Sequence, residues 1–233
     1  MKHSTKRPKS LYKYRPWSNT LKRKESGIVE EVNYTEKLLT ERCFYCQSPP
    51  DFDDPHDSFT GPSATGSELD IDRFVIERMA LVVKAMKETG ATSLVQLAKL
   101  NDPRALGALS GIAGQDARKG YRVLSLSTKS SCEQMWAFYA DYHKGICLEF
   151  NGQHSFFEEI RPVSYSAEPP APELNNFDDL AYSKSEAWAY QDEWRLRSNS
   201  EFLEFPTGLL RRVVIGYRFP ELQYQSLLDS LIA

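Results

Sequence analysis

The feature that most constrains the fold is a change of hydrophobic period in the middle of the chain. Apolar and basic residues alternate over 11–15, and the strand period of two returns over 121–127. Over 71–89, apolar residues recur at helical spacing, and Gly90 provides a stop. We therefore predict strand-rich ends and a helical insertion around 70–119.

The remaining patterns predict an α+β protein. Ser131 and Gln134 are spaced as a capping box for a helix that 144–145 would end, and Thr35 would cap a short helix over 35–42. The chain has no internal repeat and no strict alternation of strands and helices, which favours a mixed, mainly antiparallel sheet. Further strands are predicted at 27–34, 43–46, 146–150, 162–165, 193–197 and 211–216, and a last helix at 220–232.

Composition and charge divide the chain into an arm and a body. With 41% hydrophobic and 26% charged residues, the 233-residue chain is typical of a globular protein. Residues 1–24 hold nine Lys or Arg and no acid; because the whole chain carries −3, the other 209 residues carry −12. We expect a basic arm with the first strand at 1–24 and one α+β domain at 25–233. The arm could contact phosphates, remain solvated or dock on the acidic body.

Several classes of protein are excluded by missing features. No run of eighteen apolar residues suits a membrane span, and the basic N-terminus lacks the apolar core of a secretion signal, so we expect a cytoplasmic protein. Four scattered cysteines are expected to be reduced thiols. Walker A, HExxH and G-x-S-x-G motifs are absent, and Gly107, Gly111 and Gly114 lack the dinucleotide-binding spacing. Cys43 and Cys46 have zinc-ligand spacing, but no second ligand pair follows.

The loop at 51–57 holds four carboxylates and His56. It could shape turns, with Phe52 attached to the core, position a ligand, or bind a divalent metal through two of its carboxylates and the imidazole of His56.

Two groups of residues could line a binding site. Ser125 and Ser127 alternate with leucines, so their hydroxyls share one side of a strand and could orient a sugar or phosphate, or be the polar side of an edge strand. Trp136, Tyr139 and His143 form a helical stripe that could belong to the core or stack on a flat ring.

The most distinctive feature is Glu193-Trp194-Arg195. In a strand, the carboxylate of Glu193 and the guanidinium of Arg195 share one side while Trp194 points to the other. The two charges could form a structural ion pair, or Arg195 could lower the pKa of a catalytic Glu193. We expect Arg15, Ser127 and His143 to line the same cleft as Glu193.

LYKYRP, FYCQSPPDFDDPHD, VLSLS, MWAFYADYHKGICLEF and YQDEWRL together resemble the domain of unknown function 2971 family of bacterial and phage-associated proteins. That family usually has Asn where Asp53 stands and His where Phe138 stands. The chain more distantly resembles the ADP-ribosyltransferase fold, especially the DNA-targeting toxins of the DarT group.

This second resemblance implies an enzyme that cleaves NAD. The N-terminal segment with Tyr14 and Arg15 and the loop with Phe52 and Asp54 would hold NAD, and Glu193 would be the catalytic carboxylate, with Arg195 beside it. The remaining residues of the NAD site would be Ser125, Ser127, Trp136, Tyr139 and His143. The acceptor of ADP-ribose would be a nucleic acid, a protein or water, in a toxin or phage-defence effector with an antitoxin or other partner chain.

Two other classes remain open from the residues. A metal-dependent nuclease would gather Asp53, Asp54, Glu149 and Glu193 around a divalent ion, and a chelator would abolish its activity. A non-catalytic module would use the arm and the aromatic stripe to hold nucleic acid or protein. Such a module would keep its function after Glu193→Gln.

Overall fold

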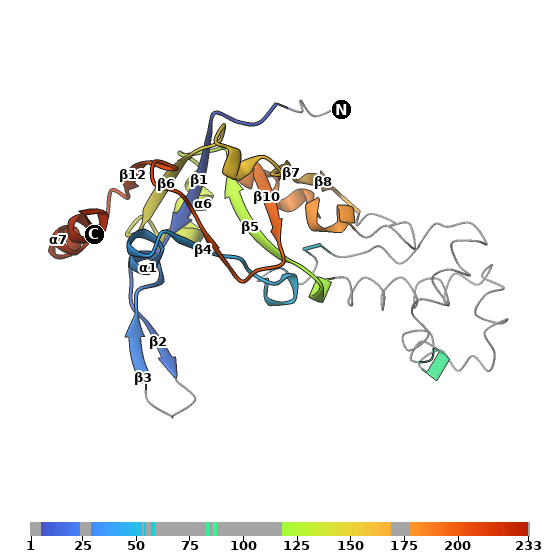
Figure 1. Ribbon diagram of the computed structural model, residues 1–233, viewed down its shortest axis with the longest axis horizontal. Coiled ribbons are helices and arrows are strands. Elements are labelled where there is room, and N and C mark those ends of the chain that lie inside the picture. Colours follow the sequence, from blue (N-terminus) through green and yellow to red (C-terminus); the bar gives the residue numbers. More distant parts are fainter. Residues whose placement is uncertain are drawn as a thin grey trace.

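The computed structural model describes residues 6–23, 29–52, 54, 57–58, 83, 86–87, 118–168 and 178–232. Its centre is a six-stranded sheet in which neighbouring strands pair antiparallel (Figure 1). In spatial order the strands are β12 (Leu210–Ile215), β6 (Ile146–Asn151), β1 (Ser10–Arg15), β5 (Arg122–Ser127), β10 (Glu193–Ser198) and β7 (Arg161–Pro162).

Smaller strand pairs and short helices surround this sheet. Antiparallel pairs join β2 (Thr20–Arg23) to β3 (Val29–Val32) and β4 (Cys43–Tyr45) to β11 (Phe202–Glu204). β8 (Ser164–Ser166) runs parallel to β9 (Ser183–Ser185). The α-helices whose bounds lie within the described residues are α1 (Tyr34–Thr40), α6 (Glu133–Tyr139) and α7 (Tyr224–Ile232). The described 3-10 helices are η1 (Pro49–Asp51), η2 (Ser155–Phe157), η3 (Asp178–Tyr182), η4 (Glu186–Gln191) and η5 (Glu221–Gln223).

The predicted α+β class with a mainly antiparallel sheet is confirmed. Most predicted strands reappear within one or two residues of their expected ends, although 162–165 is divided between β7 and β8. Within the described part of the chain, no helix has the length and apolar character needed to cross a membrane.

The alternation within β5 and β10 assigns the two faces of the sheet. Leu124 and Leu126 are buried in the main core, where Trp194 lies opposite Leu126 on the neighbouring strand. Leu38 of α1 and Leu227 of α7 belong to the same core. The other face carries the polar residues of both strands. α6 packs on β1, where Met135 and Trp136 cluster with Tyr14.

Two helix boundaries differ from those predicted. The cap of α1 is Asn33, whose side chain accepts hydrogen bonds from the backbone N–H groups of Thr35 and Glu36, so Thr35 is not the cap. The predicted capping box at 131–134 does not form, because the N-cap is Cys132 and it makes no side-chain cap bond. α6 ends at Tyr139, and His143 lies beyond it with φ of +67°.

The predicted helical stretch at 70–119 lies almost wholly outside the described residues. Those described within it are helical: Val83, Met86, Lys87, Arg118 and Lys119. The arm and body also divide differently from the predicted boundary, because β1 is an interior strand of the sheet. Before it, Arg7 donates to the carbonyl of His154 at 2.8 Å, so this arm cation docks on the body.

Candidate functional site

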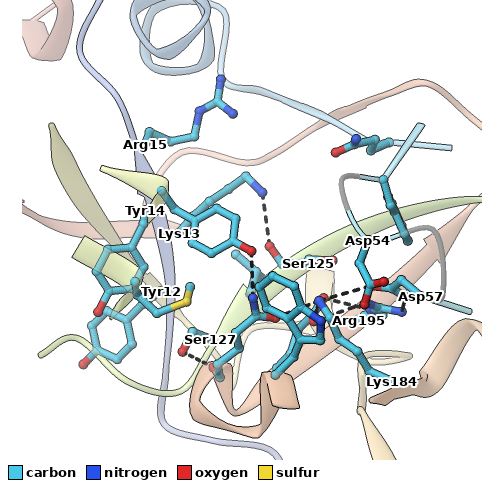
Figure 2. A pocket seen from close by; sticks show the side chains of 18 residues that line it. Tyr12, Lys13, Tyr14, Arg15, Asp54, Asp57, Ser125, Ser127, Lys184 and Arg195 are labelled. Carbon is cyan, nitrogen blue, oxygen red and sulfur yellow. Dashed lines mark hydrogen bonds and ion pairs between the residues drawn. The ribbon is translucent and has the colours of Figure 1, made fainter. Parts of the chain in front are cut away.

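A cavity of about 290 Å³ opens where β1 and β5 part. Tyr12 and Ser127 are the only aligned pair of these strands, so the ladder stops after one step. Beyond that point, the Nζ of Lys13 donates to the carbonyl of Ser125 at 3.1 Å (Figure 2). A lysine side chain therefore crosses the opening in place of continued strand pairing.

Glu193 and Arg195 form a buried ion pair on one wall of this cavity. Arg195 Nε donates to Glu193 Oε1 at 2.8 Å, and its Nη2 donates to Oε2 at 3.2 Å. The two residues are only 6% and 1% exposed. Their shared side of β10 and the burial of Trp194 on the other side confirm the orientation predicted from the strand period.

Asp57 and Lys184 extend this pair into a cluster of two carboxylates and two cations. Asp57 accepts from Nη1 and Nη2 of Arg195 at 2.7 and 2.6 Å. Lys184 Nζ lies 3.1 Å from Asp57 Oδ2 and 3.1 Å from Glu193 Oε2. Arg195 Nη1 also donates to Ser58 Oγ and to the carbonyl of Ala181. Every nitrogen of Arg195 is thus bonded inside the protein, so Arg195 can act on a ligand only by positioning its neighbours.

The cluster keeps Glu193 ionised. Burial alone would raise the pKa of Glu193, but Arg195, Lys184 and a hydrogen bond from Ser125 lower it from 4.5 to about 2. The same carboxylates raise the pKa of Arg195 against the opposing effect of its burial.

Because of this pKa shift, the free energy of unfolding depends on pH in the acidic range. Because the unfolded state binds more protons between pH 4.5 and about 2, the contribution of Glu193 is complete above pH 4.5 and is lost as pH falls through that range. The shift corresponds to about 3 kcal/mol. Urea unfolding at pH 7, 4 and 3 should therefore show a larger loss for the wild type than for Glu193→Gln. Parallel losses in the two proteins would contradict this assignment.

Ser125 and Ser127 both line the cavity, and two hydrogen bonds hold the hydroxyl of Ser127. Ser127 Oγ donates to the carbonyl of Gln191 at 2.6 Å and accepts from the N–H of Lys129 at 3.0 Å, which ties β5 to the turn before β10. Asp192 in that turn has φ of +45°, a conformation that Asp tolerates better than most residues. This turn brings Glu193 to the start of β10.

A chain of hydrogen bonds leads from the charged cluster to Tyr139 of α6. Gln191 Oε1 accepts from Lys184 Nζ at 2.7 Å, and its Nε2 donates to Tyr139 Oη at 2.7 Å. Lys184 Nζ also lies 5.3 Å from the centre of the Trp188 ring. Tyr139 and Trp188 thus place aromatic surface in the cavity and are connected to Glu193 through Gln191 and Lys184.

Arg15 lies at the other end of the cavity from Arg195 (Figure 2). Its Nε donates to Thr35 Oγ1 at 3.3 Å, while Thr35 donates to the carbonyl of Pro16. Gly145 packs directly against the Arg15 carbonyl, where a Cβ would clash. Burial lowers the pKa of Arg15, and no described carboxylate forms an ion pair with it.

The cavity brings together nine of the eleven predicted site residues: Tyr14, Arg15, Phe52, Asp54, Ser125, Ser127, Tyr139, Glu193 and Arg195. Tyr14 contributes its ring, because its hydroxyl donates to the carbonyl of Lys129 at 2.8 Å. Phe52 is half-buried at the wall rather than fully buried, with Arg195 Cζ 5.4 Å from the centre of its ring.

Trp136 and His143 lie outside the residues that line the cavity. Trp136 meets Tyr14 edge to face and stacks on His143, with ring centroids 5.2 and 5.7 Å apart. His143 Nε2 lies 3.3 Å from a carboxylate oxygen of Glu133. The predicted common cleft for His143 and Glu193 is therefore not formed, because α6 ends before His143 and the chain turns away.

The predicted metal grouping is not formed by its described members. Glu149 lies opposite Tyr12, which lies opposite Ser127, which lies opposite Glu193. Three strand spacings separate the two glutamates by about 14 Å. Asp53 and His56 lie outside the described residues, and no group of three or more potential metal ligands occurs within the described ranges.

Nine residues that line the cavity were not predicted as site residues, and four of these belong to the charged cluster, bond to it or bridge the opening: Lys13, Asp57, Lys184 and Gln191. Lys13 and Gln191 do have local signals, since each lies within two residues of a predicted site residue. Asp57 belongs to the carboxylate-rich stretch 51–57, but no pattern links it to Arg195, and Lys184 lies in β9, a short strand that the sequence pattern does not predict.

Comparisons of the chain with models of protein families, with curated proteins and with solved structures find no match in any of the three. The two resemblances drawn from the sequence therefore remain predictions.

Proposed function

We propose that this protein is an ADP-ribosyltransferase that cleaves NAD and transfers ADP-ribose to a macromolecular acceptor. The fold would then be a variant of the ADP-ribosyltransferase fold. In the reaction, the bond between nicotinamide and ribose breaks, a nucleophilic atom of the acceptor bonds to the ribose carbon, and the acceptor's proton is released. Nicotinamide leaves with the electrons of the broken bond.

One observation supports this proposal above the others. A carboxylate held in its ionised form beside Arg195 and a cation without a described counterion, Arg15, line one cavity. Figure 2 shows Arg15 and Arg195 at its two ends. Three residues along β1 and two strand spacings separate Arg15 from Glu193, which places their Cα atoms on the order of 14 Å apart. A ligand with an anionic group distant from a reacting sugar suits this arrangement.

The chemistry at Glu193 follows from its charge. Departure of nicotinamide builds positive charge on the ribose, as in other oxocarbenium-like reactions. A preorganised carboxylate stabilises that charge more in the transition state than in the ground state, which is the condition for catalysis. Phe52, Tyr139 and Trp188 supply ring surface for the flat groups of the substrate.

The test is release of nicotinamide from NAD by the purified full chain, with nucleic acid and protein acceptors supplied separately and with water alone. We expect turnover that a chelator leaves unchanged. NAD at about 100 times its dissociation constant should also stabilise the fold by about 2.7 kcal/mol, which a thermal shift detects. Absence of turnover with every acceptor would contradict the proposal, whether or not NAD stabilises the fold. Cleavage of the nucleic acid that a chelator abolishes would instead favour the metal-dependent nuclease class.

A further inference from the structure

The four cations of the cavity differ in their counterions. Lys184 and Arg195 each contact both Asp57 and Glu193, so two positive charges meet two negative ones. Lys13 and Arg15, two residues apart on β1, form no ion pair with any carboxylate that the structure describes. The cavity therefore has a neutralised wall and a wall with excess positive charge.

Lys13 is held at the opening by one hydrogen bond to the part of the chain that the structure describes. Its Nζ donates to the Ser125 carbonyl and, as an ammonium group, has two further protons. Burial, followed by repulsion from Arg15, lowers the pKa of Lys13 from 10.5 to about 8, although Cys46 and Glu193 oppose the shift. A half-buried ammonium beside a second cation is unfavourable unless an anion joins them.

We propose that Lys13, together with Arg15, forms the binding site for the diphosphate group of the nucleotide ligand, in the opening between β1 and β5. This inference deepens the proposed function by assigning one end of the cavity to a chemical group and a titratable residue to its recognition. An ammonium and a guanidinium offer the charge-assisted donors that phosphate oxygens accept. The ribose would then lie at the neutralised wall, beside Glu193.

A lysine in this role makes affinity depend on pH, whereas an arginine would not. Lys13 is charged below about pH 8, so affinity should be constant there and fall by up to tenfold per pH unit above it. The charged and titratable groups that act on Lys13 are Arg15, Cys46 and Glu193. The other titratable groups that line the cavity are Asp54, Asp57, Lys184, Arg195 and the hydroxyls of Tyr12, Tyr14 and Tyr139. The pKa of Cys46 is raised to about 11 and that of Glu193 is lowered to about 2, so neither titrates between pH 7 and 9.5.

The experiment measures binding of ADP-ribose by calorimetry to the full chain between pH 7 and 9.5, with inorganic pyrophosphate at pH 7 as a second probe and adenosine as the phosphate-free control. At pH 7, Lys13→Met should weaken binding of both phosphate probes about 10- to 100-fold. Lys13→Arg should retain the affinity and abolish the fall above pH 8. Lys37→Met, on the exposed side of α1, is the matched control and should bind as the wild type does.

These binding measurements test the inference independently of NAD turnover. Equal affinity of wild type and Lys13→Met, with both proteins shown to be folded by their thermal transitions, would overturn it. So would failure of the wild type to bind either phosphate probe, or a fall above pH 8 that persists in Lys13→Arg. Phosphate-dependent binding without nicotinamide release would retain this site and reject only the proposed transferase.

Discussion

Replacing Glu193 by glutamine is expected to lower the rate of nicotinamide release about 100- to 1000-fold, the usual effect of removing one preorganised electrostatic group. The amide keeps the size of the side chain and can still accept from Arg195, but it lacks the negative charge that stabilises the ribose cation. Affinity for NAD should change much less than the maximal rate, since the charge develops only during the reaction.

Glu149→Gln is the matched control for this variant. Glu149 occupies the same face of the sheet three strands away and bonds to Ser10 at 2.7 Å and Arg212 at 2.6 Å. The Glu149→Gln variant should release nicotinamide at the same maximal rate as the wild type. If Glu193→Gln is folded and releases nicotinamide as fast as this control, Glu193 belongs only to a structural ion pair.

The sequence predicts the site where a strand period carries the information. In 122–127 and 193–198, alternation alone places Ser125, Ser127, Glu193 and Arg195 on one side and Leu124, Leu126 and Trp194 on the other. A one-residue slip would exchange these faces, so a buried tryptophan specifies the register strongly.

The alternation of residues in a strand does not predict the contacts that loop residues make. Asp57 and Arg195 are 138 residues apart, and no period links a turn residue to a strand residue. Composition did mark 51–57 as unusual, and the structure assigns one of its carboxylates to the charged cluster. The N-terminus of α1 also could not be predicted from residue type alone. Asn33 and Thr35 both suit an N-cap, and only the path of the backbone selects Asn33.

The cavity itself arises from an interruption that the sequence pattern does not contain. Lys13 and Arg15 lie on the side of β1 that alternation assigns to the core with Leu11. They reach the cavity because β1 and β5 separate after Tyr12 and Ser127. A regular strand pattern predicts pairing along its whole length, so such an opening has no local signal.

Replacing Arg195 by methionine is expected to destabilise the fold by about 3 to 5 kcal/mol, the usual cost of removing one partner from a buried ion pair. Asp57 and Glu193 would remain buried with Lys184 as the one close cation among the described residues, and Ser58 and the Ala181 carbonyl would lose a donor. The methionine fills much of the same space, so loss of charge and hydrogen bonds, rather than a cavity, accounts for most of this effect.

Urea unfolding at pH 7 measures the loss, with Arg195→Lys as the conservative variant. Lysine restores one positive charge but cannot make the paired bonds to both carboxylates, so its stability should lie between those of wild type and Arg195→Met. The gap between wild type and Arg195→Met should narrow below pH 4.5, because protonation removes the charge that Arg195 compensates. A loss below about 1 kcal/mol for Arg195→Met would place this pair in the range of exposed salt bridges. The cluster would then be too weak to hold Glu193 ionised, and the carboxylate could not have the role assigned to it.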